Sequence, residues 1–149
     1  MVSDSPNAPL AGTWYPAALA SRLAGEDVDP SSDDIVVRFN SGIGQTGCLE
    51  GSGWYYGLDG AHGNSFDLVT VLLHELGHGL GFLTLVDEST GEELMNQPEV
   101  FESMILDTQT NKLWTEMTPA ERAASAVNSG HVVFDGPAVG AAATDFLGP

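Results

Sequence analysis

Basic residues and cysteine are scarce in this chain. Four Lys and Arg residues stand against 21 Asp and Glu residues, which gives a formal net charge of −17. Such a field repels the phosphates of nucleic acids and anionic membrane surfaces, so neither is an expected partner. Cys48 is the sole cysteine and cannot close a disulfide within the chain. It is either a plain buried thiol or half of a pair whose other half is missing from this sequence.

A long uninterrupted hydrophobic run is missing as well. The most apolar segment, residues 68–86, has His74, Glu75 and His78 in its middle and is diluted by glycine and threonine. It therefore predicts a buried helix of a soluble domain and not a membrane span. No secretory signal peptide is visible, because the first six residues, MVSDSP, have neither a basic start nor an apolar core.

The length and composition fit one globular domain. With 149 residues, 42% of them hydrophobic, residues 1–149 can form a single domain with its own core. We expect an α+β fold in which a small twisted β-sheet packs on a central helix. Periodicity and turn residues predict helices over 16–24, 66–79, 98–106 and 118–130, and strands over 34–40, 54–56 and 131–134. Residues 1–16 and 138–149 are expected to be loosely structured.

The helix expected over 66–79 carries clear local signals. Asn64 or Ser65 can cap its first turn, and Asp67 places negative charge near its positive end. Apolar residues recur at helical spacing and mark a core face at positions 68, 69, 72, 73, 76 and 80. The sequence thus predicts a well-capped helix with one buried face.

Three polar side chains interrupt this apolar helix. His74 and His78 are four residues apart, so both project from one helix face and can bind one zinc ion. Glu75 lies beside His74 and can act on a zinc-bound water as general base and later as general acid. This His-Glu-x-x-His pattern predicts a zinc hydrolase, with His74 and His78 as metal ligands and Glu75 as the catalytic residue. The alternative is a pair of hydrogen-bonded core histidines without metal.

The residues after the motif carry a resemblance to a known family. Gly81 lies three residues after His78, where the metzincin pattern HExxHxxGxxH has its helix-ending glycine. The third histidine of that pattern falls at Thr84, which cannot replace an imidazole as a strong ligand. HELGHGLGF, residues 74–82, resembles the leishmanolysin-like branch of the metzincins. In that branch the third histidine follows a long insertion and precedes a methionine-containing turn.

A longer resemblance extends over residues 10–137. It is to the catalytic region of secreted bacterial metallopeptidases that carry a protease-associated domain. The matching stretches are TWYPAALA, GCLEGSGWYYGLDGAHG, DLVTVLLHELGHGLGF, VDESTGEEL and MTPAERAASAVNSG. The resemblance implies a metzincin-like N-terminal subdomain, zinc-dependent endopeptidase activity on peptides or proteins, and an extracellular location. It also implies that the chain is a piece of a larger enzyme, cut at both ends, and that the partner of Cys48 lies upstream of Met1.

The third zinc ligand is not evident from the residues. His131 offers an imidazole after an insertion, and Glu102 or Asp107 would suit a scheme in which a second helix supplies a carboxylate. The simpler readings are a strand-edge histidine, a solvated helix glutamate and a turn or capping aspartate. Asp87 follows the motif too closely to be placed. His62 either contacts substrate or holds its loop, and we favour the latter.

Three functions remain open on the sequence. The first is a zinc endopeptidase, for which the strand expected over 54–56 could bind the substrate peptide or else serve core packing. The second is a catalytically inactive scaffold fragment with a vestigial motif. The third is a small ester hydrolase, although Ser41 and Ser52 lack the G-x-S-x-G spacing of a serine nucleophile. Exposed strand edges would also favour a homodimer.

Overall fold

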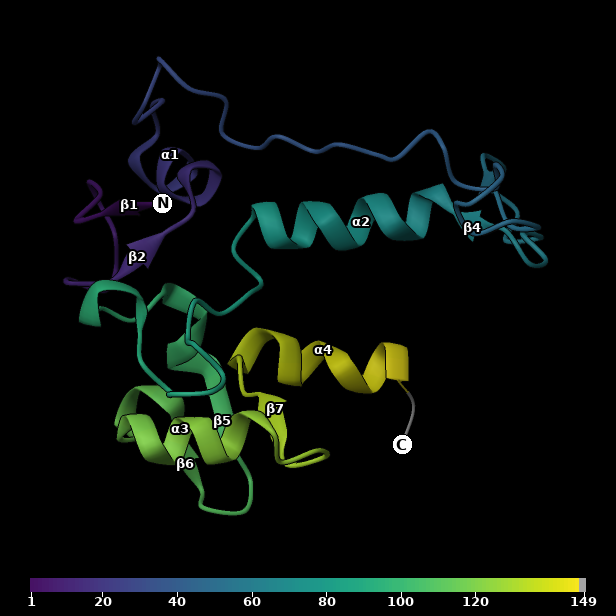
Figure 1. Cartoon of the computed structure of the whole chain (residues 1–149). Coiled ribbons are helices and arrows are strands. Elements are labelled where there is room, and N and C mark those ends of the chain that lie inside the picture. Colours follow the sequence, from purple (N-terminus) through teal and green to yellow (C-terminus); the bar gives the residue numbers. More distant parts are fainter. Residues whose placement is uncertain (148–149) are drawn as a thin grey trace.

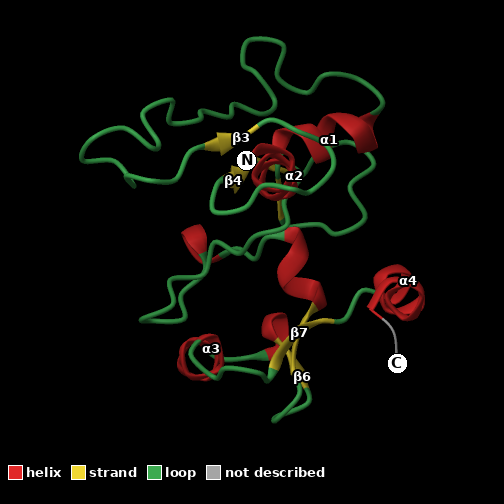
Figure 2. Cartoon of the chain, turned by 90° about the vertical axis from the view of Figure 1, so that its right-hand side faces the viewer, coloured by secondary structure: helices red, strands yellow, loops and turns green. Residues whose placement is uncertain are grey.

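The computed structural model describes residues 1–147 as a small mixed α/β domain with four helices and short sheets. Figure 1 shows their arrangement, and Figure 2 shows how much irregular chain connects them. The elements are β1 (Val2–Ser3), β2 (Trp14–Tyr15), α1 (Ala17–Ala24), β3 (Trp54–Tyr55), β4 (Phe66–Asp67), α2 (Leu68–Gly79), β5 (Ile105–Asp107), β6 (Lys112–Leu113), α3 (Pro119–Ala126), β7 (Val132–Phe134) and α4 (Pro137–Leu147). Three 3₁₀ turns lie at Leu94–Asn96, Val100–Met104 and Trp114–Glu116.

The strands pair in three separate sheets within the described residues. β1 pairs antiparallel with β2, β3 pairs parallel with β4, and β5 lies between β6 and β7 in an antiparallel sheet. The three-stranded sheet lies well away from α2 (Figure 1). The expected combination of helices with a small amount of β-structure is confirmed, but the described strands form three short sheets and not one sheet on the central helix. Only the two-residue strand β4 leads directly into α2.

The segment predicted as a strand over 34–40 explains this difference. It runs extended beside α2 but forms no strand. Ile35 packs against Gly79, where an added Cβ would come within 2.7 Å of the Ile35 side chain. At the other end, the Trp54 indole donates a 2.8 Å hydrogen bond to the Asn40 carbonyl. β-branched residues favour the extended backbone, but the adjacent helix uses its own N–H and C=O groups and offers the segment no ladder.

The described core lies between the N-terminal residues and the 3₁₀ turn at Val100–Met104. Tyr15, Ala20 and Val100 are buried together, and the Trp14 N–H donates to the Pro98 carbonyl at 2.8 Å. The Tyr15 hydroxyl accepts a 2.9 Å hydrogen bond from the Leu10 N–H. Residues 1–16 were expected to be loose, but these contacts and β1–β2 anchor them. Tertiary burial of one tyrosine outweighs the proline-rich local sequence.

Four helices were expected, and the structure has an α-helix in three of the four predicted ranges. α1 and α2 lie within the predicted ranges, and Asp67 caps α2 by accepting from the Val69 N–H. α3 begins with the capping box of Thr118 and Glu121 that its sequence announces. Over 98–106 the chain forms a 3₁₀ turn followed by β5. The segment 138–149 was expected to be loose, but its described residues, 138–147, belong to α4; residues 148–149 lie outside the described part of the chain.

A polar network supports the region around α3. The Arg122 guanidinium is buried, donates to the carbonyls of Gly91, Trp114 and Met117, and pairs with Glu93 at 2.9 Å. These contacts fix the turn that precedes α3 against the loop after Thr90.

α2 is only partly buried. No residue of this helix is fully buried, and the Leu73 side chain is 65% exposed. The prediction of a helix with one buried face is therefore wrong. The periodic apolar face lacks the sheet that was expected to cover it. No described helix is long and apolar enough to span a membrane.

Candidate metal centre

His74 and His78 project from the last two turns of α2 and face each other. Their Nε2 atoms are 2.9 Å apart, and their ring centroids are 4.4 Å apart with the rings nearly perpendicular. Helical spacing places them on one face, as the motif predicts. Both side chains are exposed, so the pair is open to solvent and to ions.

The turn after α2 fixes the tautomer of His78. Gly81 adopts a φ of +101°, which reverses the chain, and the Phe82 carbonyl then accepts a 2.9 Å hydrogen bond from His78 Nδ1. A carbonyl oxygen only accepts, so Nδ1 must carry a proton. The Nε2 lone pair of neutral His78 is thereby directed toward His74. This backbone contact is the kind that orients a metal-binding imidazole.

The geometry of the two rings suits a shared cation. Two Nε2 lone pairs that face each other at 2.9 Å repel unless a proton or a metal ion lies between them. Two imidazoles on one tetrahedral zinc ion place their nitrogens about 3.4 Å apart, so the rings need to separate by only about 0.5 Å. Exposed side chains at the end of a helix can make this adjustment. The residues present therefore fit zinc as two of its ligands.

Glu75 lies in a hollow beside the histidine pair. A cleft of about 290 Å³ is lined on one side by Glu75, His78 and Gly79 and on the other by residues 34–38. Asp34 and His78 also line a second hollow, of about 370 Å³, beneath the N-terminal residues. The sequence did not identify residues 34–38 as part of a site, because nothing in their local pattern indicates which helix they run beside.

No described side chain joins the pair as a third metal ligand. Among the side chains that the structure describes, those of residues 1–143, no three His, Cys, Asp or Glu groups come together in an arrangement that could hold a metal ion. His131 is exposed at the start of β7, where its carbonyl accepts from the Thr108 N–H. Asp107 is buried and accepts from the Ser125 hydroxyl at 2.6 Å, a hydrogen bond that is the main cause lowering its pKa. It also accepts from two backbone N–H groups, as predicted for a turn residue.

Glu102 occupies a different position from the one expected. A solvated helix residue was the simpler prediction, and this was wrong, because its side chain is fully buried. Its Oε1 accepts a 3.3 Å hydrogen bond from the Thr84 hydroxyl, and its Oε2 has no hydrogen-bond partner. Burial raises the pKa of Glu102, and also that of the neighbouring Glu99, to about 7. Thr84, at the position of the third histidine in the resembling pattern, is thus bonded away from the metal pair.

Two further candidates have local roles. Asp87 accepts hydrogen bonds from the Ser89 hydroxyl and from the N–H groups of Ser89 and Thr90, which closes a surface turn. His62 Nδ1 lies 3.0 Å from the Ser65 carbonyl, the loop-holding position predicted for it. Cys48 is partly exposed, and the Asn40 amide contacts its sulfur at 3.4 Å.

The aromatic strand β3 serves packing through one of its residues. The Trp54 ring meets Phe39 edge-on with 5.7 Å between centroids and lies 6.1 Å from Phe66. Its neighbour Tyr55 donates a hydrogen bond to Asp59. Tyr56 is 72% exposed. β3 therefore joins the extended segment to the start of α2.

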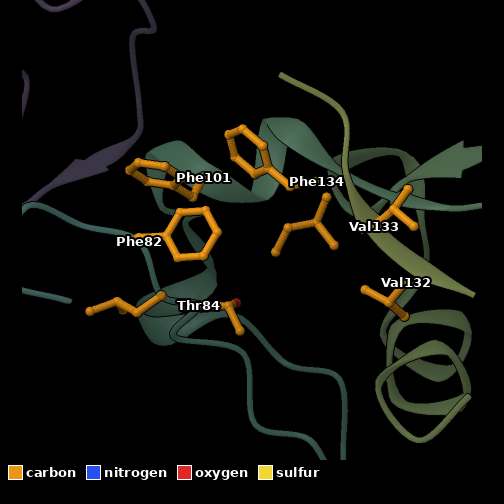
Figure 3. A pocket seen from close by; sticks show the side chains of 8 residues that line it. Phe82, Thr84, Phe101, Val132, Val133 and Phe134 are labelled. Atoms are coloured by element: carbon orange, nitrogen blue, oxygen red, sulfur yellow. The ribbon is translucent and has the colours of Figure 1, made fainter. Parts of the chain in front are cut away.

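A separate apolar pocket of about 250 Å³ is lined by residues that come after the motif in the sequence. Figure 3 shows the rings of Phe82, Phe101 and Phe134 grouped at one end, with Val132, Val133 and Thr84 around the rest. The ring centroids of the three phenylalanines lie 5.3 to 5.8 Å apart. Among the lining side chains, only the Thr84 hydroxyl is polar, and it already donates to Glu102. The pocket offers apolar contact and no charged group.

Comparisons with known proteins assign no relationship. No family model, no curated protein and no solved structure matches the chain.

Proposed function

We propose that this protein is a zinc-dependent hydrolase of the endopeptidase type. The observation that supports it most is the facing pair of Nε2 atoms on α2, with one ring oriented by a backbone carbonyl. Two such imidazoles and an adjacent carboxylate are the parts that a zinc hydrolase requires on one helix.

The proposed roles follow from the positions of the three side chains. His74 and His78 would hold the metal through Nε2, and the Phe82 carbonyl keeps His78 in the orientation for binding. Zinc bound there would acidify a water molecule and polarise a substrate carbonyl. Glu75 shares a cleft with His78, so its carboxylate can accept the proton of the attacking water and deliver it to the leaving amine.

The cleft suits an extended peptide. No described residue forms a hydrogen bond with the backbone N–H or C=O groups of residues 35–39. Residues 35–38 of this segment line the same cleft as Glu75, so a peptide can add to their unpaired backbone groups as a strand. We therefore propose residues 35–39, in place of the segment 54–56 that the sequence offered as one candidate, as the strand that binds a peptide or protein substrate.

An inactive scaffold fragment is the second candidate. It is favoured by the fact that only two imidazoles converge, and no third protein ligand joins them in the described residues. Two ligands hold zinc more weakly than the three found in catalytic sites. A small ester hydrolase working through the same metal-bound water remains a third possibility.

One comparison separates these functions. Bound zinc and the hydrolysis of casein and of a short-chain nitrophenyl ester are measured for the parent chain, Glu75→Ala and, as a matched histidine control, His62→Ala. One zinc per chain with casein cleavage that is lost only in Glu75→Ala supports the peptidase. Absence of both zinc and cleavage supports the scaffold. Ester cleavage that survives chelation and Glu75→Ala assigns activity to an unrelated site.

We also propose that the protein associates as a homodimer. The apolar side chains of Leu58, Leu73 and Met95 are each at least 65% exposed, and the segment 35–39 has an unpaired backbone. Multi-angle light scattering at micromolar concentration is expected to give twice the 15.6 kDa mass of the chain. A single species of monomer mass would exclude the dimer.

The resemblance to secreted metallopeptidases makes an extracellular location part of the proposed peptidase function.

A further inference from the structure

The chain has few basic side chains, and half of them form ion pairs in the structure. Lys112 pairs with Glu121 and Arg122 pairs with Glu93. Arg22 lies in the last turn of α1. The fourth, Arg38, lines the cleft that contains Glu75 and His78. Arg38 is exposed and forms no ion pair or hydrogen bond with any residue in the described part of the chain.

Arg38 belongs to a segment whose two ends are attached. Ile35 packs on Gly79 at the C-terminal end of α2, while Phe39 and Asn40 contact Trp54 in the strand that pairs with β4 just before α2. The segment therefore runs antiparallel to α2. Three extended residues span about 10 Å, and the four helical residues from Gly79 back to Glu75 span about 6 Å. Arg38 thus lies about 4 Å beyond Glu75 along the helix axis, roughly one peptide residue.

We infer that Arg38 is a specificity-determining residue that binds a carboxylate group of the substrate one or two residues from the scissile bond. This inference rests on the proposed peptidase function of the cleft. The carboxylate belongs either to the C-terminus of a short peptide or to an Asp or Glu side chain.

The electrostatics of the chain give the reason. A net charge of −17 repels carboxylate-bearing peptides over the whole surface, and Glu75 adds negative charge inside the cleft. A guanidinium at this position compensates locally, and its planar fork binds both oxygens of a carboxylate. A positively charged peptide would need no such group, because the general field already attracts it. An unpaired arginine beside the candidate metal pair therefore points to an anionic ligand group.

The test uses three short peptides that differ only in the C-terminal residue or in its end group. One ends in a free carboxylate, one ends in a carboxamide, and one ends in a carboxamide but carries glutamate as its last residue. Each is titrated into the zinc-loaded full chain by calorimetry and is also assayed for cleavage. The variants are Arg38→Gln, Arg38→Lys and, as a control of equal charge change outside the cleft, Arg22→Gln.

The parent chain is expected to bind at least one carboxylate peptide about fivefold more tightly than the plain carboxamide, the scale of an exposed ion pair. Arg38→Gln removes this preference, Arg38→Lys retains part of it, and Arg22→Gln retains all of it. Preference for the first peptide alone assigns a C-terminal carboxylate, and preference for the third assigns an acidic side chain. Equal binding of all three peptides by the parent, or an unchanged preference in Arg38→Gln, overturns the inference. Failure of every peptide to be cleaved counts against the peptidase alone, because the binding ratios still decide the role of Arg38.

Discussion

Replacing Glu102 by glutamine should stabilise the protein at alkaline pH and much less so in mild acid. Glu102 is fully buried, and its Oε2 has no hydrogen-bond partner. The charged groups that face it are Glu93, Glu99 and Arg122. Arg122 is already paired with Glu93, so three carboxyl groups share one guanidinium. Glutamine keeps the shape of the neutral acid, and its Oε1 can still accept from the Thr84 hydroxyl.

The magnitude follows from the pKa. Burial raises the pKa of Glu102 from 4.5 to about 7, a difference of about 2.5, and each pH unit corresponds to 1.36 kcal/mol. A carboxyl group with a raised native pKa binds its proton more tightly in the folded state. Its effect is therefore neutral below pH 4.5, grows as pH rises, and reaches a loss of about 3 kcal/mol above pH 7. Glu99 adds to this loss by less than its own pKa suggests, because the two groups interact.

The carboxyl groups with lowered pKa do not mask this window. The pKa of Glu121 falls to about 2, chiefly through its hydrogen bond from Lys112, and that of Asp67 falls through its hydrogen bond from Thr70. Such groups contribute stability that is present above the unfolded pKa and is lost only in stronger acid. Between pH 4.5 and pH 7 the change should therefore come mainly from Glu99 and Glu102.

Urea unfolding at pH 5 and pH 8 measures the effect. The parent chain should lose stability from pH 5 to pH 8. Glu102→Gln should be more stable than the parent by up to about 3 kcal/mol at pH 8 and by less than about 1 kcal/mol at pH 5. Glu88→Gln, a change of the same kind at an exposed residue, should alter neither value by more than about 0.5 kcal/mol. A parent chain that gains stability from pH 5 to pH 8, or a variant that is less stable at pH 8, would refute the reasoning.

Two further substitutions probe packing. Arg122→Ala should destabilise the fold by about 3–5 kcal/mol in urea unfolding, because it leaves the Glu93 side chain, which is only 14% exposed, without its cation and three carbonyls without a donor; a loss below about 1 kcal/mol would show that water replaces the guanidinium. Gly81→Ala should cost about 1–3 kcal/mol in the same measurement, because φ is +101° and the new Cβ would lie 2.5 Å from Pro16 Cγ; an unchanged midpoint would mean that the turn relaxes freely.

The sequence predicted local features of the fold well. The capping box at Thr118 and Glu121 and the helix that carries the motif both depend on neighbours within a few residues. Helical spacing alone places the His74 and His78 side chains on the same face of the helix. These features could be predicted because the interactions that form them are short-range.

Features that depend on distant partners were predicted poorly. The segment 34–40 has a strand-like composition, but pairing needs a second strand beside it, and a helix lies there. Glutamate is typical of exposed helix positions, so the sequence predicted a surface residue at Glu102. Its burial depends on packing against segments around Thr84 and Arg122. Arg38 has no motif around it, and its place in the cleft follows from contacts of Ile35 and Trp54 at the ends of its segment.

Zinc affinity should depend on the buried carboxyl groups as well as on the histidines. Residues 81–84 connect the two regions, since the Phe82 carbonyl holds His78 and the Thr84 hydroxyl is bonded to Glu102. Ionisation of Glu102 above pH 7 leaves a buried charge whose Oε2 has no partner, which should favour local opening of the segment bonded to it and weaken the support of His78. Glu102→Gln should therefore bind zinc about fivefold more tightly than the parent at pH 8 and equally at pH 5. The two proteins are compared at the same pH and differ only at residue 102. Equal zinc affinity at pH 8 would show that the turn holds His78 without help from the carboxyl cluster.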